Sequence, residues 1–178
     1  MEKITLPDGW HEVSIRTFQE LSNIKTENGM NKIVDLISVL TDIDSEEIKT
    51  MSVEDFNLIL PKIEWTSKQP TEEYKTNIVI NDKEYFLVKL NTLSVGEWID
   101  LDSWVKDSIA NIHKIFALLY RPANEEYDTV KRVEREELFL DKMIISDVYG
   151  TLLFFLAIGN QYLNLIKDYT TKPITTME

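Results

Sequence analysis

Residues 93–122, LSVGEWIDLDSWVKDSIANIHKIFALLYRP, decide the fold of this chain. Ser94 and Glu97 form the S-x-x-E pattern of a capping box, which begins a helix. Apolar residues then recur at helical spacing, at Ile109, Ile112, Phe116 and Leu119. Pro122 ends the region, because a residue that precedes proline is pushed out of the helical conformation. We predict that this segment is the central helical region and that the neighbouring elements pack on it.

Capping residues and helical periodicity predict further helices on both sides of this region. Ser14 and Ser52 are the expected N-caps of two of them. The expected helices cover about residues 15–24, 30–40, 45–51, 53–61, 129–143 and 146–169. The helix over 129–143 is rich in charge and is expected to be solvated, with ion pairs between residues four apart. Residues 3–13 are expected to be extended.

A change of period predicts one β-hairpin. Apolar and polar residues alternate over 78–80 and again over 85–89, and Asn81-Asp82-Lys83 is a tight turn between the two runs. A lone hairpin is only marginally stable, so it must pack on the helices or pair with the extended N-terminal segment. The expected fold is therefore mostly α (α+β), a multi-helix domain with one small β-hairpin.

The chain has 178 residues, of which 43% are hydrophobic, and this is enough for a single domain over 1–178. Residues 66–76 are polar and interrupted by proline. They divide the chain into an N-terminal helical part, 1–66, and a hairpin-plus-helical part, 77–178, as a possible subdivision.

The formal net charge of −12 disfavours binding to nucleic acids and to anionic membranes, and it favours basic partners. The N-terminus shows no apolar core of a signal peptide, and the longest apolar run, 152–158, is far shorter than a membrane span. There is no cysteine, so disulfides and thiolate chemistry are excluded.

Residues that commonly perform catalysis or bind metals are few and scattered. His11 and His113 are isolated, and His113 is expected to be a boundary residue hydrogen-bonded to a neighbour. Three aspartates, Asp100, Asp102 and Asp107, form a row of carboxylates around Trp98 and Trp104 in the central region. Its spacings of two and five do not converge on a helix. We therefore expect no enzyme activity, no cofactor and no metal site.

Residues 42–46 faintly resemble the start of a calcium-binding loop. Asp42, Asp44 and Glu46 alternate there as ligands would, but the required glycine and the distal bidentate glutamate are missing. The segment is therefore not predicted to bind calcium.

Aromatic residues are concentrated in the last predicted helix and around the central region. Either they are core residues or one face of them meets a partner or another copy of the chain. The candidate interface residues are Tyr149, Phe154, Phe155, Tyr162, Trp98 and Trp104.

The order of several segments resembles a known group of proteins. The segments are 6–21 (LPDGWHEVSIRTFQEL), 33–56 (IVDLISVLTDIDSEEIKTMSVEDF), 85–102 (YFLVKLNTLSVGEWIDLD), 111–122 (NIHKIFALLYRP), 134–139 (EREELF) and the FF-x-x-x-G pattern at 154–159. They are similar to small proteins of the structural modules of tailed bacteriophages, including crAss-like phages, which comprise tail-assembly chaperones and minor virion proteins.

The resemblance implies binding rather than catalysis. It implies a virion-associated structural or assembly protein that contacts portal or tail proteins within an oligomeric assembly, located in the virion or the host cytoplasm. The alternatives are a non-virion tail-assembly chaperone that binds the tape-measure protein and, from the net charge, an acidic inhibitor of a host protein.

Overall fold

The computed structural model describes residues 4–27, 29–70 and 73–157. It is mostly helical, with a small antiparallel sheet of three strands, which confirms the predicted fold class. The α-helices are α1 (Ile15–Ser22), α2 (Gly29–Thr41), α3 (Ser45–Lys49), α4 (Val53–Ile63), α5 (Val95–Val105), α6 (Ser108–Leu119) and α7 (Thr129–Lys142), and a last helix covers 145–157. The strands are β1 (Asn77–Ile80), β2 (Lys83–Leu87) and β3 (Tyr120–Arg121), and 3₁₀ turns lie at η1 (Trp10–Glu12), η2 (Glu64–Ser67) and η3 (Leu90–Thr92). None of the helices in the described ranges is both long and apolar enough to span a membrane.

The predicted serine caps begin their helices. The side chain of Ser14 accepts a hydrogen bond from the backbone N–H of Thr17 at 3.2 Å and caps α1. At α5 the capping box is complete, because the carboxylate of Glu97 also accepts from the backbone N–H of Ser94 at 2.7 Å. These local bonds explain why helix starts could be predicted from the sequence.

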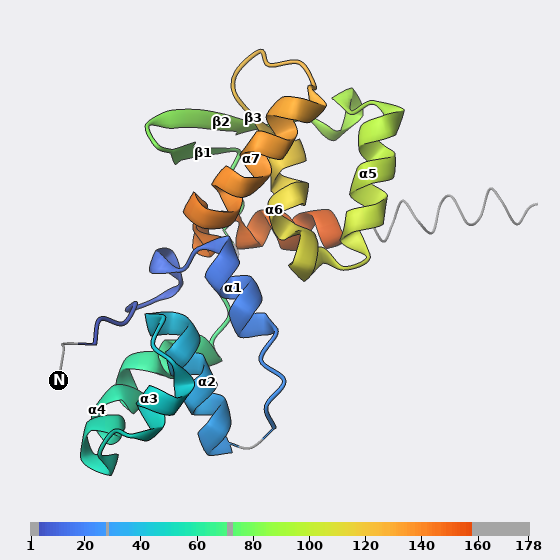
Figure 1. Ribbon diagram of the computed structural model, residues 1–178. Helices are drawn as coiled ribbons and strands as arrows, with labels where there is room; N and C mark the ends of the chain where they lie inside the picture. Colours follow the sequence, from blue (N-terminus) through green and yellow to red (C-terminus); the bar gives the residue numbers. More distant parts are fainter. Residues whose placement is uncertain (1–3, 28, 71–72, 158–178) are drawn as a thin grey trace, which may run out of the picture.

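The central region consists of two helices. The chain turns at Lys106 and Asp107, and the carboxylate of Asp107 accepts from the backbone N–H of Ala110 at 3.4 Å to begin α6. The five residues 115–119 of α6 are each 0% exposed, so the second half of α6 is buried on all sides, whereas its first half is partly exposed. α6 is the central helix because α5, α7 and the sheet surround it (Figure 1).

The predicted hairpin is present and acquires a third strand. Asn81 and Asp82 both have positive φ, 49° and 59°, as the type I′ turn of a two-residue hairpin requires. β3 follows α6 directly and pairs with β2, with Phe86 opposite Arg121. From residue 4 onwards, where the structure describes it, the N-terminal segment does not pair with the hairpin, and a bridge instead joins Ser14 to Ile144. The expected extended segment also contains η1.

Buried apolar residues form two clusters. The main cluster joins α1, the sheet, α5–α7 and the last helix, and a smaller cluster joins α2, α3 and α4. Leu21 and Trp65 pack against both clusters. In Figure 1, α2–α4 lie together below α1, on the side of the molecule away from the sheet and α5–α7.

Tyr120 connects α6 to two distant segments inside the main cluster. Its hydroxyl donates to the carbonyl oxygen of Lys75 at 2.5 Å and lies 3.2 Å from the Thr151 hydroxyl. Burial raises the pKa of Tyr120 to about 12; nearby Tyr74 and Asp147 act in the same direction, and the Thr151 hydrogen bond opposes them.

This raised pKa predicts a loss of stability at high pH. An unfolded tyrosine ionises near pH 10, whereas folded Tyr120 stays neutral, so the free energy of unfolding is expected to fall as pH rises from about 10 towards 12. Tyr120→Phe should cost about 1 kcal/mol at neutral pH and should lose stability less steeply above pH ~10. Urea unfolding at a series of alkaline pH values measures both effects, and equal slopes for the two proteins would contradict the assignment.

Candidate functional site

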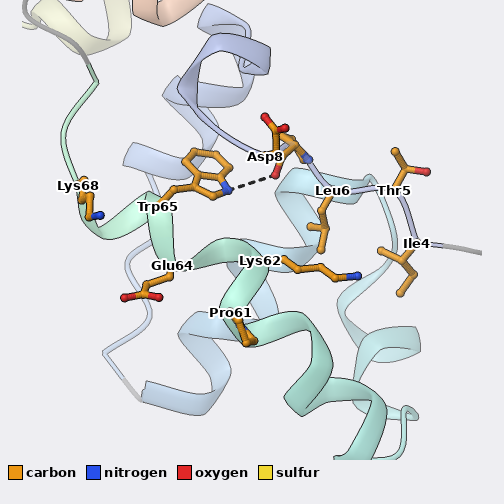
Figure 2. Close-up of a pocket in the computed structure, with 10 residues that line it drawn as sticks. Ile4, Thr5, Leu6, Asp8, Pro61, Lys62, Glu64, Trp65 and Lys68 are labelled. Atoms are coloured by element: carbon orange, nitrogen blue, oxygen red, sulfur yellow. Dashed lines mark hydrogen bonds between the residues drawn. The ribbon is translucent and has the colours of Figure 1, made fainter.

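The first surface depression, the arm groove, lies between the N-terminal segment and the end of α4 (Figure 2). It has a volume of about 670 Å³. Its walls combine apolar side chains with charged ones of both signs, from Ile4, Thr5, Leu6, Pro7, Asp8, Pro61, Lys62, Glu64, Trp65 and Lys68. Lys62 extends across the groove towards Ile4 in Figure 2.

Two tryptophans hold the N-terminal segment against η2 and so form this groove. The indole N–H of Trp65 donates to the Pro7 carbonyl at 3.1 Å, the bond drawn in Figure 2. The indole N–H of Trp10 donates to the Lys68 carbonyl at 2.7 Å, and the two rings meet edge to face at 4.9 Å. Because each indole bonds the other's segment, the groove walls are fixed.

Beside the arm groove, Asp8, His11 and Glu12 place three ligand-type atoms within 4.8 Å of one another. Their spacing in the sequence predicts no such group, because η1 was not expected there; a 3₁₀ turn brings residues i and i+3 onto one side. All three are exposed, and His11 is 2.9 Å from the Asp8 carboxylate. The cluster is a solvated histidine–carboxylate contact with a second carboxylate beside it, in which Glu12 accepts from the Asp8 backbone N–H at 3.0 Å.

The candidate interface residues occupy different environments. Phe155 is 4% exposed and belongs to the main cluster. Tyr149 is half-buried and packs edge to face on Phe18 at 6.1 Å. Trp98 and Trp104 are half-buried against the main cluster. Tyr162 lies outside the described residues, so an interface role for the set as a whole stays a prediction.

Among the described members of this set, Phe154 is the one that is well exposed, and it lines a second depression, the aromatic groove. This groove has a volume of about 830 Å³ and lies between the sheet, η3 and the last helix. Three aromatic side chains around it remain accessible: Tyr74 at 45%, Phe86 at 39% and Phe154 at 44%. The Tyr74 and Phe154 rings meet at 5.0 Å, and Lys89 is the charged residue of the lining.

Buried arginines form the polar feature that the sequence analysis missed. Arg132 and Arg135, expected on a solvated helix, are 9% and 5% exposed. The prediction of a wholly solvated α7 is therefore wrong, because positions 132, 135 and 139 share the face that carries buried Phe139 onto α6. The spacing of three and seven residues from Arg132 to Arg135 and Phe139 was the sequence signal that could have predicted this buried face.

Each buried arginine has a carboxylate partner. Arg121 pairs with Glu97, Arg132 with Glu136 and Arg135 with Glu125. Arg135 also donates to the Ala117 carbonyl at 3.1 Å, and Arg132 lies 4.9 Å from the Trp104 ring centroid.

The Arg121–Glu97 pair joins β3 to α5, and the Arg135–Glu125 pair joins α7 to the loop before it. The bond of Arg135 to the Ala117 carbonyl and the contact of Arg132 with Trp104 connect α7 to α6 and α5. Arg121 additionally lies 5.1 Å from the Tyr127 ring centroid, which fixes the loop before α7. Arg132 Nε and Arg135 Nη2 have no hydrogen-bond partner among the described residues, so the hydrogen-bonding capacity of the network is incompletely satisfied. This network holds the surrounding elements in position, because a carboxylate paired with a guanidinium offers neither a free base nor a nucleophile.

The other sequence candidates have separate local partners. Asp107 caps α6, Asp102 is 3.0 Å from the Lys106 ammonium, and Asp100 accepts from the Tyr127 hydroxyl at 3.4 Å. The carboxylate row therefore does not converge. Asp44 caps α3, and Glu46 pairs with Lys49 at 2.6 Å.

His113 is a boundary residue bonded to a neighbour, as expected. Its Nδ1 lies 3.2 Å from the side-chain nitrogen of Gln19, which also donates to the Ile109 carbonyl. Burial lowers the pKa of His113, and nearby Lys114 and Arg16 lower it further while Glu137 opposes them.

The comparisons with known proteins add no relative. No protein-family model matches this chain, and no curated protein or solved structure shows significant similarity to it. The bacteriophage resemblance therefore depends on the sequence segments quoted above.

Proposed function

We propose that this protein is a structural or assembly protein that acts by protein–protein contact, in the portal or tail region of a tailed bacteriophage. The aromatic groove is the observation that carries the proposal. Clustered, accessible apolar side chains on an otherwise well-packed protein mark surfaces that other proteins cover. Aromatic residues are also enriched where protein interfaces are most buried.

The groove suits an apolar partner segment. Phe86 comes from β2, Tyr74 from the connector and Phe154 from the last helix, so three rings from separate elements face one depression. Lys89 supplies one cation at its border. Helices of a long tail protein, or a loop of a portal or tail subunit, have the chemistry to fill it.

Substitution in the groove tests the proposal. Tagged protein recovered from infected cells should co-purify with a portal, tail or tape-measure protein identified by mass spectrometry. Phe154→Ser should reduce this recovery by about tenfold, since an interface aromatic commonly contributes more than 1 kcal/mol. The control is Ile99→Ser on α5, which removes an apolar side chain that is more exposed than Phe154, 65% against 44%, and lies outside the groove. Equal losses from both variants would argue against the groove.

Purified virions separate the two subclasses. A chain present in stoichiometric amount supports a virion component. A chain absent from virions but recovered with the tape-measure protein supports a tail-assembly chaperone. If neither association is found, the proposed function is wrong.

A second candidate is an acidic inhibitor of a host protein. Exposed carboxylates gather around α3 and the start of α4, with Lys49 among them: Asp42, Asp44, Glu46, Glu47 and Glu54. Electrostatic binding of a basic host site would weaken strongly with added salt, whereas contacts in the aromatic groove would not. Loss of all recovered partners at raised salt would favour the inhibitor.

A further inference from the structure

The aromatic groove lies where the chain leaves the last helix. Phe154 and Phe155 line the groove, and the description of this helix ends at residue 157, two residues further on. The arm groove is instead lined by residues 4–8 and by the end of α4 with η2. Residues 158–178 follow in the sequence. They are therefore tethered at the border of the aromatic groove.

The sequence of this C-terminal segment predicts a short amphipathic helix over 161–169. Gly159 is the residue type that most often ends a helix, and Asn160 is a favoured N-cap for a new one. Apolar residues then recur at the i, i+3, i+4, i+7 spacing of one helix face, at Tyr162, Leu165, Ile166 and Tyr169. A helix this short is only marginally stable alone in water, so its apolar face needs a surface to pack on.

The aromatic groove offers such a surface. The side chains of Tyr74, Phe86 and Phe154 are 45%, 39% and 44% exposed, and aromatic rings pack favourably on one another. Lys89 is the charged residue of the lining. The side-chain charges of the C-terminal segment cancel, with Lys167 and Lys172 against Asp168 and Glu178. The net negative charge of the chain therefore does not repel this segment from the groove.

The covalent tether selects this occupant over a second copy of the chain. Residues 158–160 span at most about 10 Å, so the predicted helix begins beside the groove. A short flexible tether gives an effective concentration in the millimolar range. A second copy in dilute solution is far less concentrated, so the chain's own segment reaches the groove first.

We propose that residues 161–169 fold back as a helix, cover the aromatic groove with their apolar face and leave it when a protein partner binds. The inference deepens the proposed function and rests on it for the partner, because it adds a regulation of the same groove. The covering itself involves this chain alone, so it can be tested without any phage protein.

A spin label on the C-terminal segment tests the covering in the full chain. The chain has no cysteine, so Thr171→Cys provides a single attachment site for a nitroxide. In dilute, isotope-enriched protein, the label should broaden the amide signals of Val88 and Asn91, which line the groove. The amide signal of Ile48, in the smaller cluster, should not change. Equal signals from the groove amides with oxidised and reduced label would overturn the proposal.

Two matched variants test the predicted helix face. Ile166→Asp places a carboxylate against the apolar groove, so it should lower the ratio of covered to open molecules by about tenfold or more. Asn164→Asp introduces the same residue on the opposite face and should leave the broadening unchanged. Equal effects of the two variants would contradict the helix face.

A mixed sample separates the chain's own segment from that of a second copy. Spin-labelled chain without isotope is mixed with isotope-enriched chain without label. Broadening of the groove amides in this mixture at the same dilution would show that a second copy covers the groove, and the proposal would be wrong. We expect no broadening in the mixture.

Co-purification from infected cells tests the regulation. Ile166→Asp should increase the recovery of the phage partner, whereas Asn164→Asp should not. Unchanged recovery with Ile166→Asp, despite broadening in the spin-label experiment, would refute the regulatory role. If no variant recovers a partner, the proposed function fails, and the spin-label result still decides whether the segment covers the groove.

Discussion

Phe155→Asp is expected to unfold the protein. Phe155 is 4% exposed in the main cluster, and removal of a buried phenylalanine side chain alone costs about 3–5 kcal/mol. The new carboxylate would either be buried without a partner or force the last helix away from the core, and both add to the loss of folding stability. The sum approaches the whole stability of a typical domain, about 5–15 kcal/mol.

The adjacent residue provides a matched control. Phe154 is 44% exposed and contacts the Tyr74 ring, so Phe154→Asp should cost only about 1 kcal/mol and leave the fold intact. Circular dichroism and urea unfolding compare the two variants. If Phe155→Asp remained folded and lost only its assembly, Phe155 would be an interface residue after all. If both variants unfolded, the exposed position of Phe154 would be wrong.

Glu97→Ala is expected to produce the second large loss of stability, about 3–5 kcal/mol. Glu97 is 3% exposed, closes the capping box of α5 and pairs with Arg121, which is itself 8% exposed. The substitution removes the bond to the Ser94 N–H and leaves a buried guanidinium without its counter-ion. Urea unfolding measures the change.

Two further variants separate the effect of the Glu97 charge on stability from the effect of its side-chain shape. Glu97→Gln retains an acceptor for Ser94 and should be less destabilised than Glu97→Ala. The double variant Glu97→Gln with Arg121→Met removes both charges and should recover part of the loss, since the uncompensated charge is gone. If the double variant were destabilised by the full sum of the single changes, the two residues would not be coupled.

The Glu97 pair also predicts acid sensitivity. Burial alone would raise the pKa of Glu97, but hydrogen bonds from Ser94 and the Arg121 guanidinium outweigh it, and the pKa lies below its ordinary value. The stabilisation is therefore complete above the unfolded pKa of about 4.3 and is lost as pH falls through the lower folded pKa. Glu97→Gln should show a shallower loss of stability in this acid range. Identical acid profiles would exclude Glu97 as a contributor.

Local features of the fold could be predicted from the sequence. Ser14, Ser52 and Ser94 begin helices because a cap needs only a side chain and an N–H three residues away. The hairpin turn could be predicted for the same reason, because Asn81 and Asp82 tolerate positive φ.

Features that depend on distant neighbours could not be predicted in this way. β3 contains only Tyr120 and Arg121, too few residues for a periodic signal, and it exists because α6 delivers them beside β2. The burial of Arg132 and Arg135 likewise depends on α6 packing against α7, and Glu125 approaches only through the loop between them.

The features of the candidate site also fall into these two groups, those predictable from neighbouring residues and those set by distant ones. The sequence by itself determined the helices, their caps, the hairpin and the surplus of aromatic residues in the last helix, because each of these is written in neighbouring residues. Only the tertiary structure decided that Phe155 is core and Phe154 is surface, since adjacent helical positions differ by what lies opposite them. It also decided that Tyr74, Phe86 and Phe154 share one groove, because packing brings together segments that are far apart in the chain.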